Sequence, residues 1–246
     1  MSRIFNSIQG LNKKGLAILV DPDKLDAATL DELIILSIQA KVDYFLVGGS
    51  LISSDNLDYT VKKLCEVKSI PTLLFPGNGQ HIHPNADAIL LLSLISGRNP
   101  EFLIGQHVIA APSLKRSGLE IIPTGYMLID GGQQTTASYI SSTNPIPGDK
   151  ADIAVATAMA GEMLGLKLLY LDAGSGAQKP VSSKMIQKVK AATQAPLLVG
   201  GGIDSVVKAE LALQAGADII VVGNATEKDP SFITELAKLM AEVQYT

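Results

Sequence analysis

The sequence predicts a single α/β domain over residues 1–246 that folds as a TIM (β/α)8 barrel, and three observations lead to this prediction. Short apolar runs alternate with amphipathic stretches along the chain. There are eight such runs in 246 residues, which suits eight β/α units. The 47% hydrophobic content supports one large core, and no internal break favours two domains. A flat doubly wound sheet is the alternative for the same alternation.

The apolar runs set the expected strands, and the stretches between them set the expected helices. The strands are residues 16–20, 44–47, 72–75, 88–92, 125–129, 168–171, 197–199 and 219–222. The helices are residues 25–40, 100–114, 153–164, 182–193, 205–215 and 232–243. The longest loop, residues 131–150, is rich in Thr, Ser, Asn, Pro and Gly, and this composition predicts a mobile lid.

The third crossover, residues 76–87, is unusually short and contains two prolines and two glycines. No normal helix fits there, so we expect the third outer helix to be missing or replaced by a loop. A barrel that lacks one outer helix would have a groove along its side, and Leu and Ile side chains there would suit a long apolar chain. A loop capped by other segments is the alternative.

Composition excludes several classes of protein. The net charge of −4, the absence of Trp and the 4% of aromatic residues leave no basic stripe with stacking rings, so nucleic acid is not an expected partner. The longest apolar run, residues 88–95, falls short of the ~20 residues of a membrane-spanning helix. The single cysteine, Cys65, has no partner for an intramolecular disulfide, and residues 1–15 have no apolar core for secretion. We therefore expect a cytoplasmic protein.

Three glycine turns close three of the last strands. They are the string from Tyr170 to Ala177, the run Gly200-Gly201-Gly202, and the pair Gly223-Asn224. Each turn follows a strand and precedes a helical pattern, so backbone N–H groups at helix starts can converge on one oxyanion. The sequence therefore predicts a phosphate site at the carboxyl ends of these strands.

The first strand ends in Asp21-Pro22-Asp23-Lys24, which places two carboxylates at the same rim. Magnesium takes carboxylate oxygens and keeps waters and substrate phosphates, so one or two protein ligands suffice. We expect Asp21 to be the ligand and Asp23 to be the N-cap of the helix that starts near Leu25. Ser50, after the second strand, would either complete the metal shell or cap the next segment.

Further strings complete a set of motifs that spans nearly the whole chain. They are Gly48-Gly49-Ser50, Phe75-Pro76-Gly77-Asn78, the string from Ser93 to Pro100, and Ile122-Pro123-Thr124-Gly125-Tyr126. With these and the turns above, the chain resembles the geranylgeranylglyceryl phosphate synthases, the family that also includes the bacterial heptaprenylglyceryl phosphate synthases. The resemblance implies magnesium-dependent transfer of a prenyl group, with twenty carbons favoured, from its diphosphate to the 3-hydroxyl of sn-glycerol 1-phosphate. Diphosphate is released, and the product is an ether lipid.

The resemblance also implies roles for single residues. Asp21 and Ser50 would hold Mg²⁺, and Asp172 and Tyr170 would be the catalytic residues, with Asp172 accepting the proton of the attacking hydroxyl. The expected glycerol phosphate site consists of Tyr170, Leu171, Asp172, Ala173, Gly174, Ser175, Gly176, Gly201, Gly202, Gly223 and Asn224. Many relatives have glutamate in place of Asp172, and one branch has lysine in place of Leu19. The shorter aspartate arm needs a shifted backbone, a closer substrate or a bridging water.

Four residues are expected at the diphosphate and prenyl carbons: Lys24, Arg98, Glu120 and Tyr126. For Arg98 the alternative is the capping of a helix, and for Tyr126 it is packing. The apolar face of residues 153–164 favours a dimer or a larger ring such as a hexamer. An insoluble donor and product motivate peripheral membrane contact.

Three other functions would use the same barrel. A phosphosugar isomerase or epimerase would share the phosphate site but needs an acid and a base that flank one carbon. A thiamin or tryptophan pathway synthase would lack the Asp21-Pro22-Asp23-Lys24 and Ile122-Pro123-Thr124-Gly125-Tyr126 strings. A non-catalytic lipid-binding protein would tolerate Asp172→Asn without a measurable effect.

Overall fold

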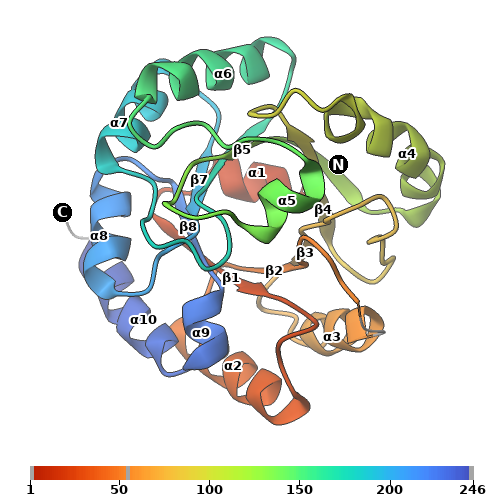
Figure 1. Cartoon of the computed structure of the whole chain (residues 1–246). Helices are drawn as coiled ribbons and strands as arrows, with labels where there is room; N and C mark the ends of the chain where they lie inside the picture. The colour runs from red at the N-terminus through yellow and green to blue at the C-terminus, as the bar shows by residue number, and fades with distance from the viewer. Residues whose placement is uncertain (1–2, 54–55, 244–246) are drawn as a thin grey trace.

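The computed structural model of the protein describes residues 3–53 and 56–243, so both ends of the expected domain 1–246 lie outside the described residues. The strands are β1 Gly15–Val20, β2 Tyr44–Val47, β3 Thr72–Leu74, β4 Ala88–Leu94, β5 Glu120–Leu128, β6 Leu168–Asp172, β7 Leu197–Gly200 and β8 Ile219–Val222. Each strand pairs in parallel with the next, and β8 pairs with β1 (Figure 1). The barrel prediction is confirmed, and the flat doubly wound sheet is wrong, because that sheet would leave two edge strands unpaired.

The helices lie around the strands, most of them in an outer ring (Figure 1). They are α1 Arg3–Gln9, α2 Ala27–Ala40, α3 Asn56–Cys65, α4 Gln106–Ser117, α5 Thr136–Ser141, α6 Ala151–Met163, α7 Ser183–Ala192, α8 Val206–Gln214, α9 Asn224–Lys228 and α10 Phe232–Val243, with a π-helical segment at Glu101–Gly105 before α4. The six expected helices are present with ends displaced by a few residues. Four helices lie outside the expected set: α1, α3, α5 and α9. The short helices α1, α5 and α9 hold too few repeats of the helical period to be recognised, and polar residues fill half of the 10 positions of α3, which leaves few apolar residues to mark that period. No helix in the described ranges has the length and apolarity needed to cross a membrane.

The third crossover contains no helix, as predicted. Its histidines hold the loop in place instead. The Nδ1 atom of His81 accepts a hydrogen bond from the N–H of Gly77 at 3.1 Å, and Nε2 of His83 lies 3.0 Å from Oδ1 of Asp58 on α3. Both rings are buried. The loop is thereby a fixed wall, and it stands in place of the outer helix that would otherwise connect β3 to β4.

Strand β5 begins five residues before the expected start at residue 125. A proline lacks the N–H that a strand ladder uses, which argues against a strand across Pro123. The structure continues the pairing with β4 through this position, and the Pro123 carbonyl still accepts a hydrogen bond from Lys167 at 2.8 Å. The first residue of the strand, Glu120, consequently lies at the amino end of the barrel.

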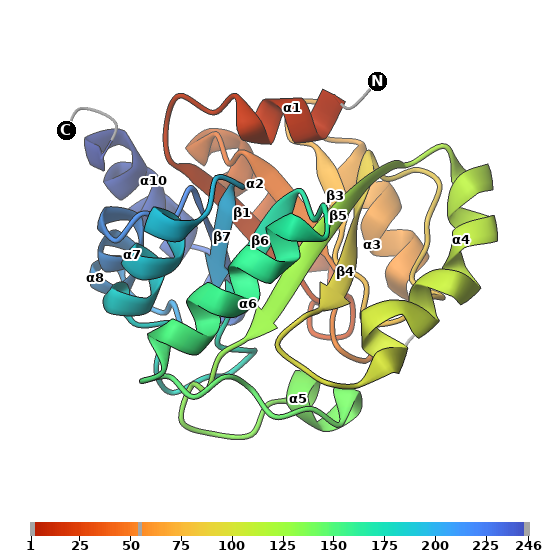
Figure 2. The same ribbon diagram turned by 90° about the horizontal axis from the view of Figure 1, so that it is seen from above.

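Helix α1 covers that amino end, whereas α5 lies at the carboxyl end (Figure 2). The carboxylate of Glu120 accepts hydrogen bonds of 2.8 Å from the N–H groups of Ile4 and Phe5, which are first-turn donors that α1 cannot satisfy internally. The expectation that Glu120 contacts the diphosphate is therefore wrong. That expectation rested on the position of Glu120 in a motif string. Because β5 starts early, at Glu120, the whole length of the strand separates this residue from the carboxyl ends of the strands.

The core has two layers, one inside the barrel and one between strands and helices. Alternate residues of each strand point to opposite layers. On β5 and β6, Tyr126, Leu128 and Tyr170 belong to the inner layer, whereas Met127 and Leu171 belong to the outer one. The same alternation turns Asp172, the last residue of β6, toward the mouth of the barrel.

Candidate active site

A polar cavity of about 550 Å³ lies at the carboxyl ends of the strands. Most of the residues predicted to bind glycerol phosphate line it: Tyr170, Asp172, Gly174, Ser175, Gly176, Gly201, Gly202, Gly223 and Asn224. Leu171 and Ala173 do not line this cavity, and their side chains pack in the outer core layer. Their place in the motif string misled the prediction, because alternate residues of a strand face opposite ways.

The turns after β6 and β7 lie in direct contact. Gly201 has φ +79°, and a Cβ added there would lie 2.5 Å from the backbone nitrogen of Gly174 and 2.6 Å from Oδ1 of Asp172. Only glycine fits this position. The hydroxyl of Ser175 donates to Oδ1 of Asn224 at 2.8 Å, which joins the turn after β6 to the turn after β8. The three glycine turns therefore converge, as the sequence predicted.

Asp172 presents a buried carboxylate to this cavity. Its Oδ2 accepts a hydrogen bond of 2.6 Å from the hydroxyl of Tyr126, and its Oδ1 accepts one of 2.7 Å from the N–H of Gly174. Burial raises the pKa of Asp172, and the two hydrogen bonds partly oppose this effect. Each carboxylate oxygen can accept a further hydrogen bond, so Asp172 can take a proton from a hydroxyl group bound beside it.

Three aromatic rings stand beside Asp172. The ring centroids of Phe75, Tyr126 and Tyr170 are 5.5 to 5.6 Å apart in tilted and edge-on contacts. Burial first, and then the charge of Asp172, raises the pKa of both tyrosines, so both stay neutral phenols at neutral pH. Tyr126 borders both the polar cavity and a second, apolar cavity, and it is thus placed at their junction.

Lys24 lies at the centre of the polar contacts on the other side of the cavity. Its Nζ is 3.1 Å from Oδ2 of Asp21, 3.4 Å from Oε2 of Glu227, and 3.3 Å from both Oγ of Ser175 and Oδ1 of Asn224. Although partial burial opposes it, the carboxylates of Glu227 and Asp21 raise the pKa of Lys24. The structure therefore places Lys24 against the glycine turns after β6 and β8, and its contact with the diphosphate stays a prediction.

Glu227 is a site residue that the sequence reading did not identify. It lies on α9, three residues after Asn224, and its side chain is 6% exposed. Its position shortly after a turn at the barrel mouth was the available signal.

The prediction that Asp23 caps the helix near Leu25 is wrong. The N-cap of α2 is Asp26, whose side chain accepts a hydrogen bond from the N–H of Thr29. Asp23 instead accepts a hydrogen bond from the N–H of Ser53. The extra turn before α2 moves the start of that helix past Asp23.

The turns after β1 and β2 provide the oxygen atoms expected to hold magnesium. A Cβ added at Gly49 would lie 3.1 to 3.2 Å from the carboxyl atoms of Asp21, so the two turns nearly touch, and Ser50 follows directly. Within residues 3–53 and 56–243, no cluster of three or more His, Cys, Asp or Glu side chains could hold a metal. One carboxylate and one hydroxyl, supplemented by waters and substrate phosphates, match the needs of Mg²⁺. The donor set thus fits the ion that the resemblance implies.

Arg98 does not reach either cavity. Its guanidinium donates to the carbonyl oxygens of Ile95 at 3.3 Å and Gly97 at 2.8 Å in the turn after β4. The side chain is exposed and lines neither cavity. The diphosphate role expected for Arg98 is therefore wrong in this structure, and the helix-capping alternative is wrong as well, because both acceptor carbonyls belong to the turn after β4 and not to a helix.

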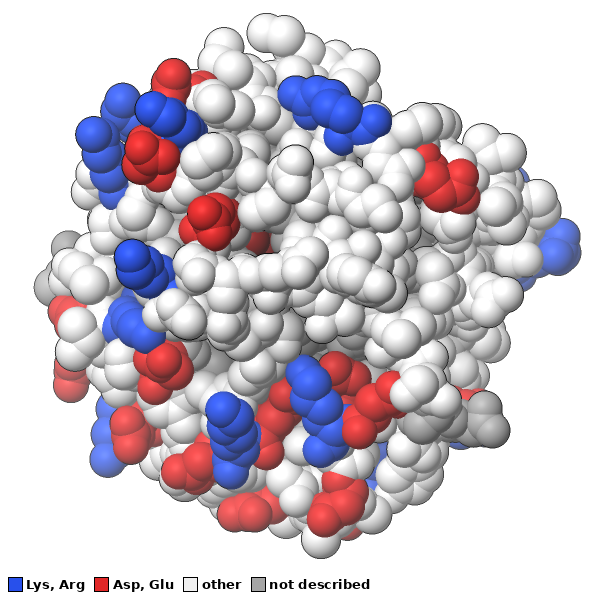
Figure 3. All heavy atoms as spheres, in the orientation of Figure 1, with Lys and Arg blue, Asp and Glu red and all other residues white. Residues whose placement is uncertain are grey.

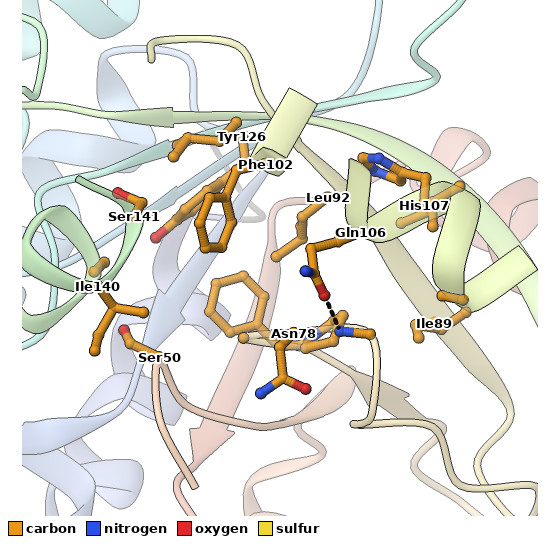
Figure 4. Close-up of a pocket in the computed structure, with 18 of the residues that line it drawn as sticks. Ser50, Asn78, Ile89, Leu92, Phe102, Gln106, His107, Tyr126, Ile140 and Ser141 are labelled. Atoms are coloured by element: carbon orange, nitrogen blue, oxygen red, sulfur yellow. Dashed lines mark hydrogen bonds between the residues drawn. The ribbon is translucent and has the colours of Figure 1, made fainter. Parts of the chain in front are cut away.

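The apolar cavity lies between β4, the third crossover and α4 (Figure 4). Ser50 and Tyr126 border it near the barrel mouth, and Ile89 and Leu114 lie toward the amino end of the barrel. The side chain of Gln106 accepts a hydrogen bond of 3.0 Å from the N–H of Gly79, the dashed line in Figure 4, and so links α4 to the crossover loop. The predicted groove along the missing helix is confirmed.

The expected lid, residues 131–150, contains α5 and joins the two cavities. Ala137 lines both of them. Thr135 caps α5 and contacts Gly174, and the side chain of Gln133 donates to the carbonyl oxygen of Gly176. The lid segment therefore packs directly on the phosphate turn. Its mobility remains a prediction.

Comparison with known proteins places the chain in a family. The model of the PcrB family matches residues 10–241. Geranylgeranylglyceryl phosphate synthases are similar to this chain, with 56% identity in Spirosoma linguale (94% of this chain, 92% of that protein) and 54% in Chitinophaga pinensis (96% and 95%). The crystal structure of (S)-3-O-geranylgeranylglyceryl phosphate synthase from Thermoplasma acidophilum, in complex with substrate sn-glycerol-1-phosphate, covers 100% of both chains at TM-score 0.92 and 29% identity. The chain therefore belongs to the PcrB family.

Proposed function

We propose that this protein is a prenyltransferase that joins the geranylgeranyl group of geranylgeranyl diphosphate to the 3-hydroxyl of sn-glycerol 1-phosphate. The observation that carries this proposal is the junction of two cavities. A buried carboxylate beside glycine turns lies next to an apolar cavity, with Tyr126 in both walls. The names of the curated relatives and the substrate bound in the Thermoplasma protein support the same reaction.

The polar cavity would bind the acceptor. Backbone N–H groups of the glycine turns would hold the phosphate group, and the glycerol 3-hydroxyl would lie beside Asp172. Asp172 takes the hydroxyl proton as the oxygen attacks the first carbon of the prenyl chain. A carbon–oxygen bond forms to the glycerol oxygen, and the bond from the same carbon to the diphosphate oxygen breaks. Orientation of the two reactants in adjoining cavities accounts for much of the rate enhancement.

Asp21 and Ser50 would hold Mg²⁺, which when bound neutralises charge on the departing diphosphate. Two carboxylates, Asp21 and Glu227, share the single ammonium of Lys24 in this part of the cavity. The surplus negative charge favours a cation there. Lys24 itself would contact phosphate oxygens, because its Nζ already lies against Ser175 and Asn224 of the phosphate turns.

The apolar cavity would bind the prenyl tail. Burial of apolar carbon contributes about 0.8 kcal/mol per CH₂ group, so a twenty-carbon tail would contribute more binding energy than one ordered phosphate. Ile82, Ile89, Leu91, Leu92, Phe102 and Leu114 supply apolar walls for it. The cavity also keeps water from the reacting carbon, where positive charge develops.

The deciding experiment incubates the protein with radiolabelled sn-glycerol 1-phosphate, Mg²⁺ and prenyl diphosphates of ten, fifteen, twenty and thirty-five carbons. Chromatography of the extracted lipid should give a labelled ether lipid, most strongly with the twenty-carbon donor. The Asp172→Asn variant is the control for chemistry at this site. Absence of labelled lipid with every donor would contradict the proposal.

We further propose that copies of the chain associate through α6, where Met163 and Leu164 are 80% and 78% exposed and Ile153 is also exposed. Light scattering after size exclusion should show an oligomer that Met163→Glu disrupts.

We also propose that the protein is cytoplasmic and makes peripheral contact with a membrane. The face around α5 is almost free of charged side chains (Figure 3), and comigration with neutral vesicles in a flotation assay tests this contact.

A further inference from the structure

Glu227, whose side chain is only 6% exposed, is a charged residue outside the reacting carboxylate that joins two groups of the site. Its Oε1 accepts a hydrogen bond of 3.1 Å from the backbone N–H of Asp21, 206 residues away in the sequence. Its Oε2 lies 3.4 Å from Nζ of Lys24. One carboxylate thus contacts both the residue expected to hold the metal and the ammonium group that contacts the phosphate turns.

Lys24 has two carboxylate partners, and they compete for it. Asp21 offers Oδ2 at 3.1 Å, and Glu227 offers Oε2 at 3.4 Å. The Asp21 carboxylate is also the group that a cation would need. An ammonium that paired with Asp21 alone would occupy the oxygen required for metal binding, because ligand oxygens and ion-pair acceptors are the same lone pairs.

From this geometry we propose that Glu227 is a positioning residue that competes with Asp21 for Lys24, weakens the Lys24–Asp21 ion pair and so makes the Asp21 carboxylate more accessible to a divalent cation. The hydrogen bond from the Asp21 N–H to Glu227 also fixes the backbone from which that carboxylate projects. The burial of the Glu227 side chain makes the arrangement rigid and keeps the charge weakly screened. The inference rests on the proposed function, since it takes Asp21 as the metal ligand.

Glu227→Gln separates the two contacts of this residue. The amide oxygen of glutamine can still accept the N–H of Asp21, whereas the charge that attracts Lys24 is lost. Mn²⁺ replaces Mg²⁺ as the probe, and inorganic pyrophosphate replaces the prenyl diphosphate. Electron paramagnetic resonance then counts free Mn²⁺ during a titration of the full chain. We expect Glu227→Gln to weaken Mn²⁺ binding roughly fivefold to tenfold.

A double-mutant cycle with Lys24→Met tests whether Glu227 acts through Lys24. Removal of the ammonium removes the competitor for Asp21, so in that background Glu227→Gln should cost less than about twofold in Mn²⁺ affinity. Glu235→Gln on α10 is the matched control, because Glu235 is an exposed glutamate of the neighbouring helix and should leave the affinity unchanged.

Three results would overturn the inference. The first is that Glu227→Gln binds Mn²⁺ as tightly as the unsubstituted chain. The second is that Glu227→Gln lowers Mn²⁺ affinity by the same factor with and without Lys24, which would mean that the Glu227 charge acts directly on the metal and not through Lys24. The third is that Asp21→Asn leaves Mn²⁺ binding intact, which would put the metal elsewhere. None of these measurements needs turnover, so a protein that makes no prenylated lipid but follows the expected pattern would contradict the proposed function and not the role of Glu227.

Discussion

Replacement of Tyr126 by phenylalanine removes one hydroxyl group and leaves the ring in its aromatic cluster. That hydroxyl donates the 2.6 Å hydrogen bond to Oδ2 of Asp172. The bond favours the ionised carboxylate, and its loss raises the pKa of Asp172 further above the ordinary value, because burial then acts with one opposing hydrogen bond fewer. Only the ionised form of Asp172 accepts a proton, so activity rises with pH as this group ionises.

The size of the effect follows from the kind of bond. A hydrogen bond to a charged group contributes about 1.5–3 kcal/mol, and 1.36 kcal/mol corresponds to about one pH unit. In Tyr126→Phe the acidic limb of the kcat/KM profile should therefore move upward by about one to two pH units. The plateau above the limb should change less, because the geometry of the acceptor site is preserved.

The assay is prenyl transfer to radiolabelled sn-glycerol 1-phosphate between pH 5 and 9, with Tyr44→Phe as the matched control. Tyr44 is also a buried tyrosine inside the barrel, but its hydroxyl lies 2.9 Å from Ser7 of α1, at the other end. The control should keep the original profile. If folded Tyr126→Phe keeps its acidic limb at the original pH, Tyr126 does not tune Asp172, and this reasoning is refuted.

Three further substitutions test other parts of the site. Asp172→Asn should lower kcat by about 10²-fold or more while thermal stability holds or rises, since the buried charge disappears; equal activity would favour a non-catalytic barrel. Gly201→Ala should raise KM for sn-glycerol 1-phosphate at least about tenfold. The control is Gly118→Ala, which also lies at positive φ but has no atom within 4 Å of an added Cβ, so it should only reduce stability. Equal KM values for the two variants would place the phosphate elsewhere. Ile89→Phe should shift preference from twenty-carbon to shorter donors in competition assays, and Ile121→Phe on the next strand should not; an unchanged preference would remove Ile89 from the tail site.

Much of the fold and half of the site could be predicted from local patterns. Apolar runs separated by helical stretches specify a barrel because strand and helix periods are properties of short segments. The absence of a helix after β3 follows from the prolines and glycines of that crossover. The phosphate turns follow from glycines at strand ends, since a left-handed residue such as Gly201 leaves few other choices.

The motif strings misled where they were treated as sets of equivalent residues. Leu171 faces away from the cavity because β6 alternates, Glu120 lies at the far end because β5 runs through Pro123, and Arg98 turns back on its own loop. In each case the residue lies in the predicted segment, but its side chain points elsewhere. Direction depends on register and strand length, which a string of residue types does not contain.

The sequence by itself determined the barrel and the three glycine turns, because each is written in neighbouring residues, and its motif strings carry the resemblance that implies Asp172 as the base. Only the tertiary structure decided which groups adjust that chemistry. Tyr126 meets Asp172 across 46 residues, and Glu227 meets Asp21 across 206, because closure of the barrel brings β5 beside β6 and β8 beside β1. Hydrogen bonds between distant segments leave no periodic trace in a sequence, so they become visible only when the strands are paired.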